Sequence, residues 1–480
     1  TGMFDRRKET FTGVTKTYSS KEIRNARRQN ILEARNLLDP SLKIIRNNNL
    51  GSDPNQLPKI EMRGSRTPPP PTPGQYSQQL KLQYENDPNR PLFILDGFET
   101  NLQSIMSLDI NRIASVTLLK DAASTALYGS RSANGVVVVE TIRPTSGDLT
   151  ISYTATGTVT MPDLSGYNMM TAEELLKFQE LASVGVDAPG PFGVFENEAN
   201  LLLVKQKHAY RKNAILDGVN SNWMKVPLQT AGTLNHHLSV TGGDGFFNYT
   251  LGLSKNGNTG VMKGSENNTN SGYANLNYRK GKITVSNNLT IRGDKREGSP
   301  YGSFTNFVRI PPYYRINYAA RFLEDQHTEH FVQNNFMAKM SYRFNNPLYN
   351  ALLPHKNTAI SNMITNNLML HWDLLPFLRV SGGFQYAKTS DQTDFFLSPL
   401  HTQFNDAEAL QKGSYEQGNA ASENYNGFLT LTYNKVIAGK HILTSNVRGD
   451  IAKNATSIQS ISAVGFATTA EPLLYLANSY

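Results

Sequence analysis

The chain has 480 residues and not one cysteine. This excludes disulfide bonds, thiol catalysis and zinc sites built on cysteine. Only 39% of the residues are hydrophobic, and no apolar run approaches the ~20 residues of a membrane-spanning helix, which excludes a helical membrane protein. Tryptophan occurs only 2 times, against 22 tyrosines and 22 phenylalanines. With abundant Asn, Ser, Thr and Gly, this composition favours β-structure with one wet face.

Chemical and nucleic-acid signatures are also lacking. The formal net charge is +8, but the basic residues are scattered among acids and form neither a dense basic face nor an RNP-type motif, so we expect no nucleic-acid partner. The chain shows no Gly-rich phosphate loop, nucleophile elbow or paired carboxylates at usable spacing. We therefore predict no catalytic residues, no enzyme activity and no cofactor. No signal peptide is visible after Thr1, so we expect a mature form or a missing start.

The segment 90–141 opens with a strand and a turn. Leu92 to Leu95 is an apolar run of strand length. Asp96 and Gly97 follow it as a turn signal, because glycine accepts positive φ and aspartate bonds local backbone. At the far end, the unbroken run from Val136 to Val139 predicts a strand buried on both faces.

A short helix and a second turn are predicted between these strands. Asp121 suits the N-cap of an alanine-rich turn or two that reaches Tyr128, and Gly129 suits its C-terminal stop. Asn134 and Gly135 predict a type I′ hairpin turn. The whole segment therefore predicts a small α+β unit, for which an ordinary soluble domain is the alternative on this pattern alone.

From residue 149 onward, apolar and polar residues alternate. Leu149, Ile151 and Tyr153 lie on one face of a predicted strand, and threonines and Ser152 lie on the other. Each such segment has about the length of a tilted transmembrane β-strand, roughly ten residues. Similar segments recur at residues 234–241, 247–254, 273–278, 283–291, 364–372, 378–386, 429–433 and 443–451. An apolar face opposite a Thr, Ser, Asn and Gly face fits lipid outside and water within.

The links between these predicted strands alternate in length. Short links are expected at 242–245, 279–282, 373–377 and 434–440, and long ones at 162–233, 256–272, 293–359 and 387–426. Outer-membrane barrels alternate short periplasmic turns with long external loops in this way. A soluble β-sandwich has no reason to keep every long loop at one end, so the pattern favours a barrel.

The segment 90–141 closely resembles the plug domain of SusC/RagA-type TonB-dependent transporters. The matching positions are Asp96, Gly97, Lys120, Asp121, Ala122, Tyr128, Gly129, Ser130, Arg131, Ala133, Asn134, Gly135 and the valine run that follows. We expect these residues to fold and seat the plug. Residues 169–182, 221–243 and 247–265 also resemble the family, and Thr171 with Glu174 predicts a capping box at the start of the first of these segments.

The resemblance implies a mainly β fold: an α+β plug at residues 1–148 in the lumen of an antiparallel transmembrane β-barrel, whose first part, with long extracellular loops, is residues 149–480. The family closes its barrel with twenty-two strands, against about nine predicted here. Members of the family normally begin with a signal peptide, usually a small extra β-domain, and a TonB box. None of these is seen before Thr1 in this sequence. We expect a fragment of a longer polypeptide or, as the alternative, one half of a split barrel.

The implied function is TonB-dependent import of oligosaccharides or oligopeptides across the bacterial outer membrane, with the plug as the gate. The implied partners are a SusD-like surface lipoprotein that covers the external loops, TonB, which acts through a TonB box absent from this chain, and outer-membrane lipid. A signalling receptor of the same fold is the second hypothesis. A soluble β-rich binding protein is the third.

Substrate-binding residues are carried over from the plug loops that face outward in the family. The candidates are Asn47, Asn48, Asn49, Asp53, Asn55, Phe98, Glu99 and Asn101. Their amides and carboxylates can exchange hydrogen bonds with sugar hydroxyls or peptide groups. A solvated, turn-rich loop is the more common role for such residues.

Three further motifs have plainer interpretations. The proline-rich stretch 65–76 predicts a stiff spacer more than a docking motif. His327, Glu329 and His330 have a loosely metal-like spacing, but they lack a helical period and further ligands, so we predict no metal site. The neighbours at 236 and 237 are both histidines, but they point to opposite faces of one predicted strand and cannot chelate together.

Overall fold

The computed structural model describes residues 15–25, 42–45, 54–55, 59–62, 89–120, 125, 128–129, 132–182, 198–332, 336–437, 441–466 and 477–479. Several predicted features lie outside these residues: Asn47, Asn48, Asn49, Asp53, Asp121, Arg131 and the proline-rich stretch. No helix in the described part of the chain is both long enough and apolar enough to cross a membrane.

The N-terminal unit is built on a five-stranded sheet with the order β1-β6-β7-β4-β5. These strands are β1 (Thr15–Ser19), β4 (Leu92–Leu95), β5 (Phe98–Thr100), β6 (Ile113–Leu119) and β7 (Val136–Thr141). Strand β7 is central, antiparallel to β6 and parallel to β4. Its four valines are buried, which confirms the prediction of a strand covered on both faces.

Short helices and a second hairpin complete the core of the N-terminal unit. Helices α1 (Ser20–Asn25) and α4 (Leu102–Met106), the 3₁₀ turn η3 (Ile110–Arg112) and the hairpin of β2 (Leu42–Ile45) with β3 (Lys59–Met62) surround the sheet. Their buried side chains form one cluster with those of the sheet: Tyr18, Ile23, Leu42, Ile60, Met62, Phe93, Leu102, Ile105, Ile113, Val116, Leu118, Val137 and Val139.

The type I′ turn forms at a different place from the one predicted. Asp96 and Gly97 have φ angles of 49° and 87°, and they join β4 to β5 between the paired residues Leu95 and Phe98. Two central residues with positive φ define a type I′ hairpin turn. Asn134 is not among the described non-glycine residues with positive φ, and the Gly135 amide donates to the Ser132 carbonyl at 2.8 Å. The prediction of a type I′ turn at 134–135 is therefore wrong.

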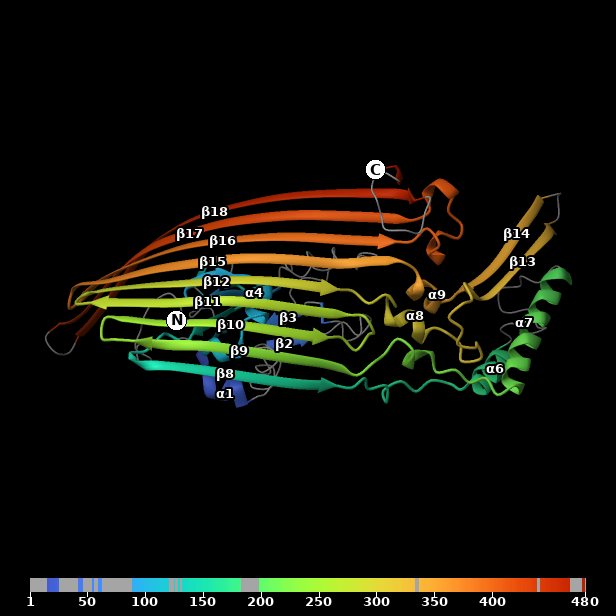
Figure 1. Cartoon of the computed structure of the whole chain (residues 1–480), viewed down its shortest axis with the longest axis horizontal. Coiled ribbons are helices and arrows are strands. Elements are labelled where there is room, and N and C mark those ends of the chain that lie inside the picture. The colour runs from blue at the N-terminus through green and yellow to red at the C-terminus, as the bar shows by residue number, and fades with distance from the viewer. Residues whose placement is uncertain are drawn as a thin grey trace.

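The large sheet contains all nine predicted strands side by side (Figure 1). They are β8 (Gly147–Thr160), β9 (Ala231–Gly243), β10 (Phe247–Thr259), β11 (Glu266–Lys280), β12 (Ile283–Glu297), β15 (His355–Leu375), β16 (Leu378–Leu397), β17 (Ser414–Ile437) and β18 (His441–Phe466), with a short tenth strand, β19 (Ala477–Ser479). All neighbours are antiparallel. Strands β8 and β19 are the two edges, and no described pairing joins them, so the sheet is not closed.

Short and long links alternate along the large sheet. Residues 244–246, 281–282, 376–377 and 438–440 join strands at one end, called here the turn end. Residues 161–230, 260–265, 298–354 and 398–413 join them at the opposite loop end. The predicted loop 256–272 is wrong at both sides, because Asn256 to Thr259 and Glu266 to Gly272 pair as strand residues.

The loop end carries a small domain of its own. It includes α6 (Ala172–Leu181), α7 (Glu198–Leu216), η5 (Trp223–Lys225), α8 (Phe304–Val308), α9 (Pro347–Leu352) and the hairpin of β13 (Phe322–Val332) with β14 (Phe336–Asn345). Helix α6 starts at the predicted capping box of Thr171 and Glu174. Buried aromatic and aliphatic residues hold this domain together: Ala172, Trp223, Phe307, Ile310, Tyr313, Tyr314 and Leu348.

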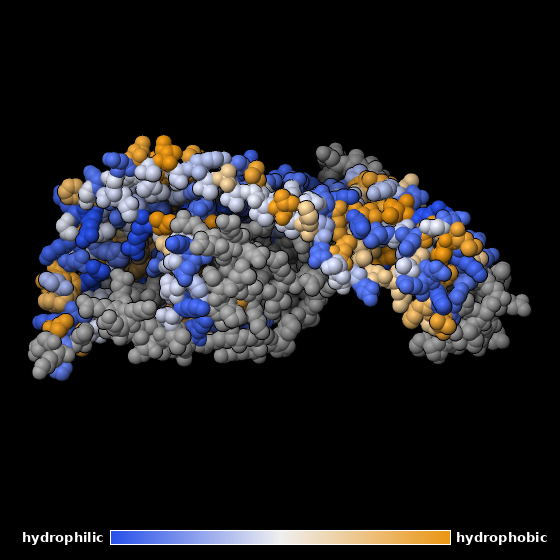
Figure 2. Space-filling model, turned by 90° about the horizontal axis from the view of Figure 1, so that it is seen from below, coloured by the Kyte–Doolittle hydropathy of each residue, from blue (hydrophilic) through white to orange (hydrophobic). Residues whose placement is uncertain are grey.

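The large sheet has two different faces. It curves, with hydrophilic residues on its concave side and hydrophobic ones along its convex outline (Figure 2). On the convex face, Ile151, Leu253 and Ile451 are 65%, 65% and 77% exposed. The N-terminal unit contacts the concave face. This division confirms the predicted alternation of apolar and polar faces.

Candidate functional site: the seam between the N-terminal unit and the large sheet

The first contact in the seam is made by a histidine and an aspartate. His237 of β9 lies on the concave face, and its Nδ1 is 2.6 Å from Oδ2 of Asp109, with both side chains largely buried. The other ring nitrogen of His237 lies 3.4 Å from the Tyr273 hydroxyl, and the two rings are stacked. His236 lies on the opposite face, as the strand periodicity predicts.

Arg112 strengthens the same contact from the N-terminal unit. Its guanidinium lies 3.9 Å from the ring centroid of Tyr273, and it donates to Thr290 Oγ1 at 3.2 Å. Asp109 is held in place as the N-cap of η3, where it accepts from the Asn111 amide at 2.8 Å. Burial acts to raise the pKa of Asp109, but the hydrogen bond and charge of His237 outweigh it, so the pKa is lowered.

The second contact is centred on Asp96, in the type I′ turn. Its carboxylate accepts from the Thr141 amide and hydroxyl, each at 2.8 Å, and from Asn288 Nδ2 at 2.9 Å. Burial raises the pKa of this carboxyl, against the lowering effect of the two Thr141 hydrogen bonds. One carboxylate thus ties β4 to the end of β7 and both of them to β12 of the large sheet.

The third contact is made by an ion pair on β12. Arg292 and Asp294 are both buried and pair at 2.7 Å between Nη2 and Oδ2. Thr269 donates to the other oxygen of Asp294 at 2.6 Å, and Arg292 also donates to Ser107 Oγ at the end of α4. Charge-assisted hydrogen bonds of this kind fix the position of α4 against the sheet.

Apolar contacts and a small cavity complete the seam. The rings of Phe98 and Phe428 are 5.5 Å apart, and the Arg448 guanidinium lies 3.8 Å from the centre of Phe428. Ser104 lies 3.6 Å from the sulfur of Met363. A cavity of about 50 Å³ lies between the two parts, with polar residues of both in its lining, which is room enough for a water molecule. The described seam therefore contains several polar contacts beside a few apolar ones, with room for water between the two parts.

The four predicted substrate residues that the structure describes have different environments. Phe98 is only 3% exposed and packs on Phe428, so it is a seam residue and does not face solvent. Asn101 is exposed, but its side chain caps α4 by accepting from the Ser104 amide at 2.8 Å. Glu99 is exposed on β5. Asn55 donates to the Glu297 carbonyl at 2.8 Å, at the loop end of β12.

The plug motif residues within the described part have structural roles. Gly129 and Gly135 have φ angles of 68° and 95°, and a Cβ on Gly135 would overlap the methyl group of Met62. Tyr128 is buried with the valines of β7. Asn134 donates to the Arg90 carbonyl at 3.4 Å, and Lys120 directly follows β6.

The seam residues of the large sheet were not predicted from the sequence. Asn288, Thr290, Arg292 and Asp294 occupy alternate positions of β12, between apolar neighbours such as Ile291. That alternation predicted a polar, water-facing side of the strand for these four residues. The same pattern could have identified Arg292 and Asp294 as charged residues within a strand. It contains nothing to show that a second domain covers that face.

No described group of three or more His, Asp or Glu residues could hold a metal ion. His327, Glu329 and His330 lie on β13, paired with β14, and their side chains are outside the described part.

Comparison with known proteins identifies the N-terminal unit. Residues 7–136 match the family model of the TonB-dependent receptor plug domain. The TonB-dependent receptor SusC of Bacteroides thetaiotaomicron is 25% identical over 189 residues, which cover 38% of this chain and 16% of SusC. The N-terminal unit is thus a TonB-dependent receptor plug domain, and the chain is similar to SusC/RagA-type TonB-dependent transporters. Its N-terminal unit is the plug, and its large sheet is called the wall from here on.

Other relatives and structures agree. The TonB-dependent receptor P39 of Formosa agariphila is 25% identical over 264 residues, covering 53% of this chain and 22% of P39. The structure of the RagAB peptide importer in the closed-closed state covers 98% of this chain and 50% of the matched chain, with a TM-score of 0.69 and 19% identity. The ferric citrate transporter FecA covers 96% of this chain and 50% of its own, with a TM-score of 0.54 and 11% identity.

These likenesses show a barrel-transporter fold, and the named relatives are transporters and receptors. The chain spans about a fifth of the length of the curated relatives it matches and half of the matched structures.

Acid is expected to loosen the seam through Asp109. Because the folded pKa of Asp109 is lowered, its contribution is fully present above the ordinary pKa of an aspartate and is lost as the pH falls through the lowered value. Asp109→Asn removes this dependence and weakens the seam by roughly 1–2 kcal/mol at neutral pH. Hydrogen exchange of plug amides as a function of pH measures both effects. An unchanged acid response in Asp109→Asn would contradict this role.

Proposed function

We propose that this protein imports oligomeric nutrients, oligosaccharides or oligopeptides, across the bacterial outer membrane, with the plug as its gate. The observation that carries the proposal is the nature of the seam. The plug is held to the wall by hydrogen bonds and ion pairs around a cavity of about 50 Å³. Water can replace such contacts when the plug moves, whereas a dry apolar seam would have to expose hydrophobic surface.

The energy source and partners follow from the family. We propose that TonB drives displacement of the plug and that a SusD-like surface lipoprotein covers the loop end. In this arrangement the loop end lies outside the cell, and the convex face of the wall contacts lipid. The small domain of the loop end, with its own buried cluster around Trp223 and Tyr313, offers a rigid base for such a partner.

The lack of cysteine permits a direct test of gating. Ser104→Cys and Met363→Cys place one thiol on α4 of the plug and one on β15 of the wall, at side chains 3.6 Å apart. This chain contains no other cysteine that could react. Bridging the pair with dibromobimane in cells is expected to abolish uptake, because the plug can no longer leave the wall.

Controls separate gating from damage. The unbridged double variant and the two single variants treated with the same reagent are expected to keep uptake. Growth is measured on defined oligopeptides and oligosaccharides, next to a strain that lacks the gene. Unchanged uptake of every oligomer in that strain would contradict import, and loss of a transcriptional response alone would support the signalling receptor instead.

A further inference from the structure

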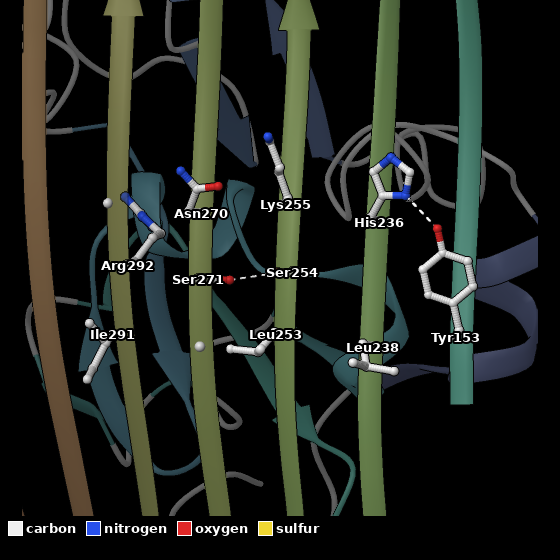
Figure 3. Close-up of a pocket in the computed structure, with 12 residues that line it drawn as sticks. Tyr153, His236, Leu238, Leu253, Ser254, Lys255, Asn270, Ser271, Ile291 and Arg292 are labelled. Carbon is white, nitrogen blue, oxygen red and sulfur yellow. Dashed lines mark hydrogen bonds between the residues drawn. The ribbon is translucent and has the colours of Figure 1, made fainter. Parts of the chain in front are cut away.

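A groove lies on the convex face of the wall, away from the plug. Its volume is about 570 Å³, and it crosses strands β8 to β12 near mid-height (Figure 3). Its position follows from the strand periodicity. His237, Tyr273 and Arg292 face the plug, so their neighbours His236, Gly272 and Ile291 face outward.

The lower part of the groove is apolar. Leu238, Leu253, Gly272 and Ile291 occupy one row across four strands, because Leu253 pairs with both Leu238 and Gly272, and Gly272 pairs with Ile291. The three large side chains are 41%, 65% and 52% exposed. Gly272 has no side chain, and Leu253 extends over it, with its Cδ2 3.3 Å from the point where a Cβ on Gly272 would lie. The three side chains thus form one apolar strip against which a hydrocarbon chain can lie.

The next row toward the loop end is polar. His236, Lys255, Asn270 and Gly293 are paired across the same four strands. The Tyr153 hydroxyl lies 2.7 Å from His236 Nδ1 and orients the imidazole beside the groove. Lys255 and Asn270 are both exposed. None of the residues that line the groove is acidic.

The environment of Lys255 differs from that of two other outward lysines, Lys388 and Lys295. Lys388 is 2.8 Å from Glu423, and Lys295 is 2.7 Å from Glu297, so each of these cations has a carboxylate partner on the wall itself. Lys255 lines a groove without a carboxylate. The groove thus combines a positive charge, with no carboxylate among its described lining residues, and an apolar row directly below it. The same face is hydrophobic further toward the turn end, at Leu251 and Leu289.

We propose that this groove binds a lipid with a phosphate headgroup. The phosphate contacts Lys255, with Asn270 and His236 as hydrogen-bond donors, and an acyl chain lies along the strip of Leu238, Leu253 and Ile291. The complementary charge selects an anionic lipid over a neutral one. The proposal rests on the membrane placement proposed above, because only that placement brings lipid to the convex face.

The test uses the protein extracted from cell membranes in mild detergent and native mass spectrometry. The probes are phosphatidic acid and phosphatidylcholine with the same acyl chains, and inorganic phosphate alone. We expect retention of phosphatidic acid over phosphatidylcholine. Lys255→Ala is expected to weaken phosphatidic acid binding about fivefold, and Lys255→Glu tenfold or more. Gly293→Leu, which fills the groove, is expected to reduce binding of both lipids.

The matched control is Lys453→Glu, on the same face of β18 and outside the groove. It is expected to retain phosphatidic acid as the unmodified protein does. Equal losses in Lys255→Glu and Lys453→Glu, or equal retention of the two lipids, would overturn the proposal. Binding of inorganic phosphate as tight as that of phosphatidic acid would also overturn it, because the apolar row would then contribute nothing. If the lipid binds as expected but no nutrient is taken up, only the proposed import function is contradicted.

Discussion

Asp96→Ala is expected to destabilise the plug and its contact with the wall by about 4 kcal/mol. The Thr141 amide and hydroxyl and the Asn288 amide lose their common acceptor, and each unsatisfied buried donor costs roughly 1 kcal/mol or more. Alanine also tolerates the φ of 49° poorly, at an additional cost of about 1 kcal/mol. Native-state hydrogen exchange at the amides of β4 and β7 measures the free energy of opening.

Asp96→Asn is the matched control. Asparagine tolerates positive φ and keeps one carbonyl oxygen to accept from the Thr141 amide, so about half of the loss is expected. Equal exchange rates in Asp96→Ala and the unmodified plug would show that Asp96 does not contribute to the stability of the plug. An effect confined to the seam, with β4 and β7 unchanged, would assign it to docking alone.

Arg292→Met is expected to loosen the plug from the wall. It leaves Asp294, whose side chain is only 3% exposed, without its cation, and breaking a buried pair in this way costs roughly 3–5 kcal/mol. It also removes the donor to Ser107 of the plug. Cells that carry the variant are expected to become sensitive to vancomycin, which is too large for porins. Killing curves against the unmodified strain measure the leak.

A double variant distinguishes the loss of the Arg292 hydrogen bond to the plug from the cost of leaving the Asp294 carboxylate unpaired. Arg292→Met with Asp294→Leu removes both partners, and apolar replacement of a whole buried pair is often close to neutral. The double variant is therefore expected to leak less than Arg292→Met alone. If the double variant leaks as much as the single one, the hydrogen bond from Arg292 to Ser107 holds the plug, and the unpaired carboxylate does not matter.

The strands were predictable because their pattern is local. Leu149, Ile151 and Tyr153 alternate with polar residues, so that one face of each strand is apolar and the other is polar. Strand ends were not predictable in the same way. Asn256, Asn258 and Asn268 are turn formers by propensity, yet they pair across β10 and β11, because the strands continue beyond the segment with alternating apolar residues. Tertiary pairing overrode local preference there.

The seam could not be predicted because its contacts join distant parts of the chain. Asp109 meets His237, and Asp96 meets Asn288, only after the plug is placed inside the curve of the wall. The family resemblance predicted the plug and its glycines, but it assigned Phe98 to the outward surface. Phe98 is the residue after the Asp-Gly turn, and burying its ring against Phe428 stabilises the fold more than exposing it to water.

The position of β1 at the edge of the plug sheet has a mechanical consequence. Among the described strands it pairs only with β6, from Thr15–Leu119 to Ser19–Ser115, so tension on the chain before Thr15 can peel it away without breaking the other described strand pairs. Its loss would take Tyr18 out of the core cluster, and Ile23 of the following helix comes next along the chain. The plug sheet is therefore easier to open at its β1 edge than at its central strand β7. Force applied at its start would open the core stepwise and leave β7, which leads into the wall, for last.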